Sequence, residues 1–159
     1  MSVDGNLLPQ GSLGEVVVKG ANVIDGYENN PEANATALVK LWGNLAFNPI
    51  SALTGATLEQ ICQYSLTREL ARQMMSEAQA IAEKLGISFG ITLEQRIDGA
   101  EKVGAHKTSM LQDIEVGRPT EIDAIVGAVA ELGKLTQSPT PHIDAVYASV
   151  KLLETTLRY

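Results

Sequence analysis

Apolar residues recur at steps of three or four positions along most of this chain, and this period constrains its fold more than any other feature. The clearest stripe consists of Leu66, Leu70, Met74, Ala78, Ile81 and Leu85. Charged residues occupy the positions between, as on a helix that buries one face and exposes the other. The stripe predicts a helix from about Thr67 to Leu85, which Gly86 ends.

Start signals indicate further helices. These signals are Pro31, the capping-box spacings Thr57–Gln60 and Thr92–Gln95, the residue Thr120, and the pair Thr140-Pro141. We expect Asn48-Pro49 to break or kink the first helix, because proline lacks a backbone N–H. Aromatic residues make up only 4% of the chain, which also favours helices over a β-sandwich. The sequence predicts an all-α fold, a compact bundle of about six to seven helices.

Residues 1–30 differ from the rest in composition. They are punctuated by Gly5, Gly11, Gly14, Gly20 and Gly26. The run Glu15–Lys19 predicts one short strand, and a single strand needs a partner for its backbone groups. That partner is either another copy of the chain or a missing piece of sheet. We therefore expect a glycine-rich extended arm over residues 1–30 and a helical domain over residues 31–159.

The charge of the chain bears on its partners and its location. A net charge of -7 disfavours nucleic acid and anionic membrane surfaces. No apolar run is long enough to cross a bilayer, and the first residues lack the basic start of a signal peptide. The single cysteine, Cys62, cannot form an internal disulfide, which fits a reducing compartment. These features predict a soluble cytoplasmic protein.

Several functional motifs are missing from the sequence. It has no G-x-G-x-x-G after a strand, no P-loop and no G-x-S-x-G nucleophile turn. His106 and His142 lie on different predicted elements, so we expect no metal site. The sequence therefore carries no nucleotide-binding or hydrolytic motif of its own.

One polar ladder lies beside an apolar helix face. Lys40, Asn44 and Asn48 are spaced by four residues, so they stack one turn apart on the same side of a helix. Polar groups that border a buried face are costly unless something polar fills the space beside them. A solvated helix face with ordinary polar residues is the other interpretation, and the spacing alone favours it.

A second polar region covers residues 104–123. Thr108 and Ser109 are suited to cap a short helix, and the free N–H groups at a helix start attract a carboxylate. Thr120 is suited to cap the next helix, whose first turn would contain Glu121. Plain helix capping, without any further function, explains both segments equally well.

Three segments together resemble one known family. They are Lys40…Asn44…Asn48-Pro49-Ile50-Ser51-Ala52-Leu53-Thr54-Gly55, then Ser109-Met110-Leu111-Gln112-Asp113, then Arg118-Pro119-Thr120-Glu121-Ile122-Asp123. In order and separation they are similar to the signature blocks of the ketopantoate reductase (2-dehydropantoate 2-reductase) C-terminal domain, from about Ala37 to the end of the chain. The resemblance implies a helical domain like the C-terminal domain of 6-phosphogluconate dehydrogenase. It also implies an N-terminal Rossmann domain for NADPH, which this chain lacks.

The resemblance implies roles for individual residues. Family members use NADPH to reduce 2-dehydropantoate to (R)-pantoate, a step towards pantothenate and coenzyme A. Lys40 matches the catalytic lysine, and Asn44 and Asn48 match residues that bind the substrate oxygens. Ser109, with backbone N–H groups of the turn from His106, matches the site of the substrate carboxylate. Glu121 matches a glutamate that reaches the ribose or nicotinamide of the cofactor.

The sequence departs from the family pattern at two positions. His106 stands where the family often has asparagine, which puts the carboxylate contact there in question. Leu58 stands where some members have another asparagine.

Three functions are consistent with the sequence. The first is the substrate-binding and catalytic half of an NADPH-dependent reductase, inactive alone and completed by a Rossmann domain in cis or in trans. The second is a stand-alone ligand-binding or dimerisation module derived from such an enzyme. The third is the corresponding half of a reductase for another small 2-keto acid. We also expect a homodimer, because exposed apolar helix surface and the unpaired strand both need a partner.

Overall fold

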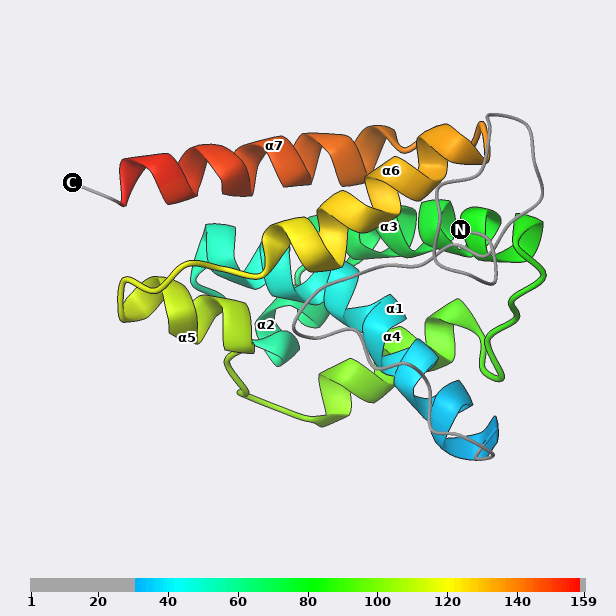
Figure 1. Ribbon diagram of the computed structural model, residues 1–159. Coiled ribbons are helices and arrows are strands. Elements are labelled where there is room, and N and C mark those ends of the chain that lie inside the picture. Colours follow the sequence, from blue (N-terminus) through cyan, green and yellow to red (C-terminus); the bar gives the residue numbers. More distant parts are fainter. Residues whose placement is uncertain (1–30, 158–159) are drawn as a thin grey trace.

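The computed structural model describes residues 31–157, and the side chains from residue 39 onward. Within these residues it contains seven α-helices and one π-helical turn (Figure 1). The elements are α1 (Pro31–Thr54), α2 (Leu58–Gln63), α3 (Ser65–Lys84), α4 (Leu93–Lys102), α5 (Ser109–Glu115), η1 (Asp123–Gly127), α6 (Ala128–Leu135) and α7 (Pro141–Thr156). The predicted all-α bundle is confirmed, whereas the predicted arm and strand in residues 1–30 lie outside the described residues.

Helix α1 forms the centre of the bundle. It contacts α3, α5 and α7 most extensively, and it also touches α2, α4 and η1. Figure 1 shows α6 and α7 on one side of α1, and α2 and α5 on the other. Trp42 anchors this arrangement, because its indole N–H donates to the Met75 carbonyl at 2.8 Å and its ring stacks on Phe89 at 4.1 Å.

Proline 49 does not break α1, so of the predicted break or kink, the break is wrong. The helix continues from Pro31 to Thr54 with Pro49 inside it, and Gly55 ends it with a φ of 71°. Phe47 and Ile50, on either side of the proline, are 2% and 1% exposed. Tight packing of these neighbours stabilises the helical path by more than the missing hydrogen bond costs.

The predicted helix over residues 67–85 is confirmed as α3, which ends at Lys84 before Gly86 (φ 76°). Two members of its predicted apolar stripe are exposed. Leu66 is 68% exposed and Leu85 is 42% exposed. These leucines lie in the first turn and just past the last, where no other helix covers them. The buried face is completed instead by Ala71, Met75 and Ala82.

The short helices begin where local signals predicted. Thr57 and Thr92 each form a complete capping box, and they start α2 and α4. Helix α7 begins at Pro141, as expected, but the Thr140 side chain makes no capping hydrogen bond. The carboxylate of Glu77 on α3 replaces it and accepts the backbone N–H groups of His142 and Ile143, both at 3.0 Å.

The π-helical turn η1 leads directly into α6. The N–H of Ala128 donates to the carbonyl of Asp123, five residues earlier. Ile122, directly before the turn, and Val126, inside it, are both fully buried. Among residues 31–157, no helix combines the length and the apolar composition that a bilayer span requires.

Candidate functional site

The Lys40–Asn44–Asn48 ladder lies along one side of α1. Each residue stands one turn, or about 6 Å, beyond the previous one. Lys40 is exposed, Asn44 is half-buried and Asn48 is only 4% exposed. Among the described residues, neither asparagine amide has a hydrogen-bond partner. The ladder therefore descends from solvent into the fold and offers polar groups at each level.

Ser109 is brought to α1 by the packing of α5 against it. Thr108, not Ser109, caps α5: it is 5% exposed, and its hydroxyl accepts the Leu111 N–H at 3.3 Å. Ser109 is the first residue of the helix and its side chain is exposed. Because the capping role is already filled, the Ser109 hydroxyl is available to a ligand.

The turn before Ser109 is tied to the start of α2. The carbonyl of His106 accepts the Leu58 N–H at 3.0 Å, and the His106 N–H donates to Gly104 at 2.7 Å. The imidazole of His106 is exposed. Because the His106 N–H is already used, it cannot contribute to the carboxylate site expected in this turn.

Glu121 is exposed and stands just before the helix that begins at Ile122. Residues on both sides of it are held by α7. The Glu154 carboxylate accepts the Thr120 N–H at 3.0 Å and the Thr120 hydroxyl at 2.8 Å. Asp123 accepts the hydroxyl of Tyr147 at 2.6 Å. These contacts fix the backbone position of Glu121.

The buried carboxylate of Glu154 stays charged. Burial alone would raise its pKa, but the hydrogen bonds from Thr120 and Lys151 outweigh burial and lower it. The pKa of Asp123 is lowered by the hydrogen bonds from Tyr147 and Lys151. Both carboxylates are committed to holding the Thr120–Asp123 segment on α7.

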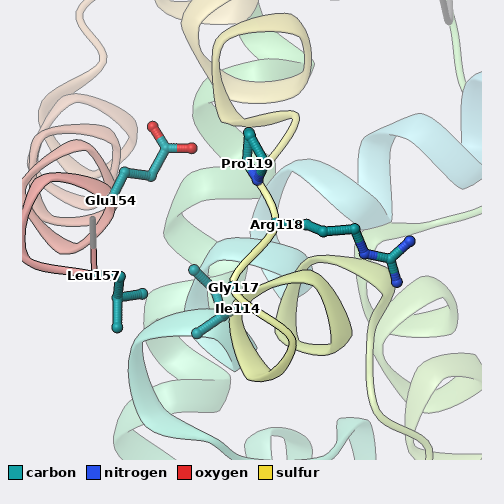
Figure 2. A pocket seen from close by; sticks show the side chains of 6 residues that line it. All are labelled: Ile114, Gly117, Arg118, Pro119, Glu154 and Leu157. Atoms are coloured by element: carbon teal, nitrogen blue, oxygen red, sulfur yellow. The ribbon is translucent and has the colours of Figure 1, made fainter. Parts of the chain in front are cut away.

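A small pocket lies away from the predicted residues. Its volume is about 100 Å³, and it is lined by Ile114, Gly117, Arg118, Pro119, Glu154 and Leu157 (Figure 2). In Figure 2 the Arg118 side chain points away from Glu154. Since none of the predicted site residues lines the pocket, and its carboxylate is already hydrogen-bonded, it is not the candidate site.

The structure adds Arg96, on α4, to the surroundings of the ladder. Its Nε donates to the carbonyl of Val39 at 3.2 Å, and its guanidinium lies 5.5 Å from the centre of the Phe47 ring. A Cβ at Gly43 would stand 2.0 Å from its Nη2. Burial lowers the pKa of Arg96, and the nearby Cys62 opposes that effect without reversing it. Gly43, an isolated glycine inside a helical pattern, was the signal of this close approach.

The predicted residues come from neighbouring elements that pack on α1. Helix α1 carries the ladder, and it contacts both α5, which carries Ser109, and η1, which follows Glu121. Among the residues that the structure describes, no three His, Cys, Asp or Glu side chains are grouped as they would be around a metal ion. The geometry suits a small polar ligand with several oxygen atoms, bound beside α1.

The described residues form an all-α domain whose central helix carries a lysine–asparagine face. Residues 32–154 match the family model described as "Ketopantoate reductase PanE/ApbA C terminal". The chain belongs to the ketopantoate reductase family and contains its C-terminal domain, as the signature blocks predicted.

Individual relatives agree with this assignment. The 2-dehydropantoate 2-reductase of Mesorhizobium japonicum is 65% identical over 115 residues, which are 72% of this chain and 35% of the relative. A crystal structure of 2-dehydropantoate 2-reductase from Methylococcus capsulatus has a TM-score of 0.70 at 33% identity, over 79% of this chain and 44% of that one. The corresponding enzyme from Geobacter metallireducens has a TM-score of 0.68 at 27% identity, over 76% and 40%. The chain spans less than half the length of these relatives.

Proposed function

We propose that this chain is the substrate-binding and catalytic half of an NADPH-dependent 2-dehydropantoate 2-reductase, which reduces ketopantoate to (R)-pantoate. The observation that carries the proposal is the Lys40–Asn44–Asn48 ladder on α1, with its two amides unpaired among the described residues. In this proposal residues 31–159 are one domain, and a nucleotide-binding domain in cis or in trans completes the site.

Lys40 acts on the keto group. Its ammonium donates a hydrogen bond to the carbonyl oxygen and stabilises the negative charge that develops when a hydride reaches the carbonyl carbon. It then gives that oxygen a proton, which completes the hydroxyl of the product. An exposed lysine on a rigid helix suits this role, because it can be covered when the second domain closes over it.

Asn44 and Asn48 orient the substrate. An amide both donates and accepts, so it can bind a hydroxyl and a carbonyl oxygen of the same molecule. Asn48, which is 4% exposed, has little rotational freedom and holds the inner end of the ligand. Ser109 contributes a hydroxyl from α5 to the substrate carboxylate.

The described residues fit only one end of the cofactor. Glu121 is exposed at a fixed backbone position, which suits a carboxylate that accepts a ribose hydroxyl or a nicotinamide N–H. When bound, NADPH supplies the hydride. The phosphates and adenine need a glycine-rich turn at a helix start, and residues 31–157 have no such turn. The chain alone is therefore expected to be inactive.

The test is NADPH oxidation with ketopantoate, with and without a separately produced nucleotide-binding domain of the family. We expect activity only from the mixture, and a loss of at least about 100-fold in Lys40→Ala. Lys102→Ala, an exposed lysine on α4, is the matched control. Activity from this chain alone, or an active Lys40→Ala variant, would contradict the proposal.

A binding measurement covers the case in which the two domains do not assemble. Ketopantoate is titrated into the labelled chain and followed by NMR. Shifts centred on Asn44 and Asn48, lost in Asn48→Ala, support the proposal. Shifts spread evenly over the surface, or no shifts at all, contradict it.

The assembly and location of the protein are part of the proposal. Leu41, Leu135 and Leu152 are 53%, 70% and 65% exposed, which supports burial against a second domain or a second copy. We propose a homodimer in the cytoplasm, where the reduced, buried Cys62 would be stable. Light scattering after gel filtration tests the dimer, and a monomeric mass contradicts it.

A further inference from the structure

Arg96 carries a positive charge that the described part of the molecule does not neutralise. Its guanidinium is half-buried between α4 and α1, and its one hydrogen bond to the described residues goes from Nε to the neutral carbonyl of Val39. The arginine on the neighbouring helix behaves differently, since Arg68 forms ion pairs with Asp98 at 2.6 Å and Glu101 at 3.1 Å. A partly desolvated charge without a counter-charge is costly, so Arg96 is suited to receive an anion.

The position of Arg96 relates it to the ladder. The carbonyl that it binds belongs to Val39, the residue directly before Lys40. Its Nη2 lies against Gly43, the residue directly before Asn44. Gly43 follows Lys40 by three residues, and residues three apart are neighbours on a helix surface, so the guanidinium at Gly43 borders Lys40.

The chemistry of a 2-keto acid places its carboxylate near Lys40. The carboxylate carbon is bonded directly to the keto carbon, so a group that binds it must lie within a few ångströms of the lysine that binds the keto oxygen. The His106 N–H, one of the donors expected for this carboxylate, is occupied by Gly104. The Ser109 hydroxyl is neutral, and a hydroxyl alone does not neutralise a carboxylate.

We propose that Arg96 binds the carboxylate of the 2-keto acid substrate, as a specificity-determining residue at the edge of the Lys40–Asn44–Asn48 ladder. This inference rests on the proposed function. Arginine suits the task because its planar fork can donate two parallel hydrogen bonds to a carboxylate while Nε keeps its contact with Val39. Gly43 is part of the same site, since any side chain there would displace the guanidinium.

The test compares two ligands that share the keto group and differ in charge. Ketopantoate has a free carboxylate and a free hydroxyl, and ketopantolactone, its neutral cyclic ester, has neither. Both are titrated into the chain and followed by NMR. We expect Arg96→Gln to weaken ketopantoate binding by at least about tenfold, and lactone binding by less than about twofold.

Gly43→Ala provides a second, independent variant. It keeps the charge of Arg96 but pushes its guanidinium away from α1, so it should also weaken ketopantoate selectively. Arg72→Gln is the matched control, because Arg72 is on α3 and pairs with Glu69 at 2.6 Å. Circular dichroism checks that each variant is folded.

The outcomes separate the inference from the proposed function. If Arg96→Gln binds ketopantoate as tightly as the wild type, or loses both ligands equally, the inference is wrong and Arg96 only supports α1. If neither ligand binds the wild type with shifts at Asn44 and Asn48, the proposed function itself fails. The Gly43→Ala result decides the inference if Arg96→Gln does not fold.

Discussion

Helix α7 is held at its start by a single side chain from another helix, Glu77, and replacing it should destabilise the domain. One carboxylate oxygen accepts the His142 N–H at 3.0 Å and contacts the imidazole Nδ1 at 2.6 Å. The other accepts the Ile143 N–H at 3.0 Å. The Glu77 side chain is 12% exposed, so water can replace it only in part.

The size of the effect follows from these contacts. Loss of a capping side chain costs about 1 kcal/mol. Hydrogen bonds to a charged group are stronger than neutral ones, and the two N–H groups left uncovered would bring the total for Glu77→Ala to about 3 kcal/mol. For a domain of this size, each kcal/mol lowers Tm by roughly 3–4 °C, so the expected shift is about 10 °C.

Thermal unfolding followed by circular dichroism at 222 nm measures this shift. Glu77→Gln keeps one acceptor oxygen, so it should lose about half as much stability. Glu83→Ala is the control, because Glu83 is an exposed glutamate on the same helix whose side chain accepts a hydrogen bond from Gln79 at 2.9 Å. A Glu77→Ala shift no larger than that of Glu83→Ala would refute the reasoning.

Three further results are expected. Glu154→Gln should lower the free energy of unfolding by about 2 kcal/mol at pH 7, because Thr120 loses a charged acceptor. Burial would raise the pKa of Glu154, but its hydrogen bonds lower it, so this stabilisation is present above the ordinary pKa of the carboxyl group and is lost as the pH falls below it. Urea denaturation at pH 7 and at pH 3 should therefore show a smaller stability difference between the wild type and Glu154→Gln at pH 3. Burial raises the pKa of Cys62 to about 11, so at pH 8 a thiol reagent should label it at least about 100-fold more slowly in the folded than in the urea-unfolded chain, and equal rates would argue against burial. Trp42→Phe should cost about 1 kcal/mol in urea denaturation, because the Met75 carbonyl loses the indole donor while it keeps its bond within α3. An unchanged midpoint would show that the indole hydrogen bond is unimportant.

Local signals account for most of what the sequence predicted correctly about the fold. The capping boxes at Thr57 and Thr92 involve residues three positions apart, so they are visible in the sequence and the structure confirms them. The Glu77 cap joins residues 65 positions apart, and no local pattern indicates it. The continuous path of α1 through Pro49 has the same origin, because it depends on packing around the proline.

The candidate site divides in the same way. Lys40, Asn44 and Asn48 share one helix, so their common face follows from their spacing alone. Helix α5, which begins at Ser109, and η1, which follows Glu121, both pack on α1, and only the resemblance to a family implied that these segments are neighbours. Arg96 was not predicted, because its contact with Val39 spans 57 residues.

The π-helical turn has a consequence for how this domain tolerates changes in length. A π turn contains one residue more than an α-helical hydrogen-bonded ring, so η1 is a one-residue insertion absorbed inside a helix. Deleting a residue from it would restore α-helical bonding but rotate all of α6 by about 100° against the residues before it. Gly133 packs so closely against the turn before α7 that an added Cβ would lie 2.7 Å from the Thr140 side chain. The rotation would move Gly133 away from this turn. Relatives one residue shorter here should therefore carry compensating changes in α6 rather than near Glu121.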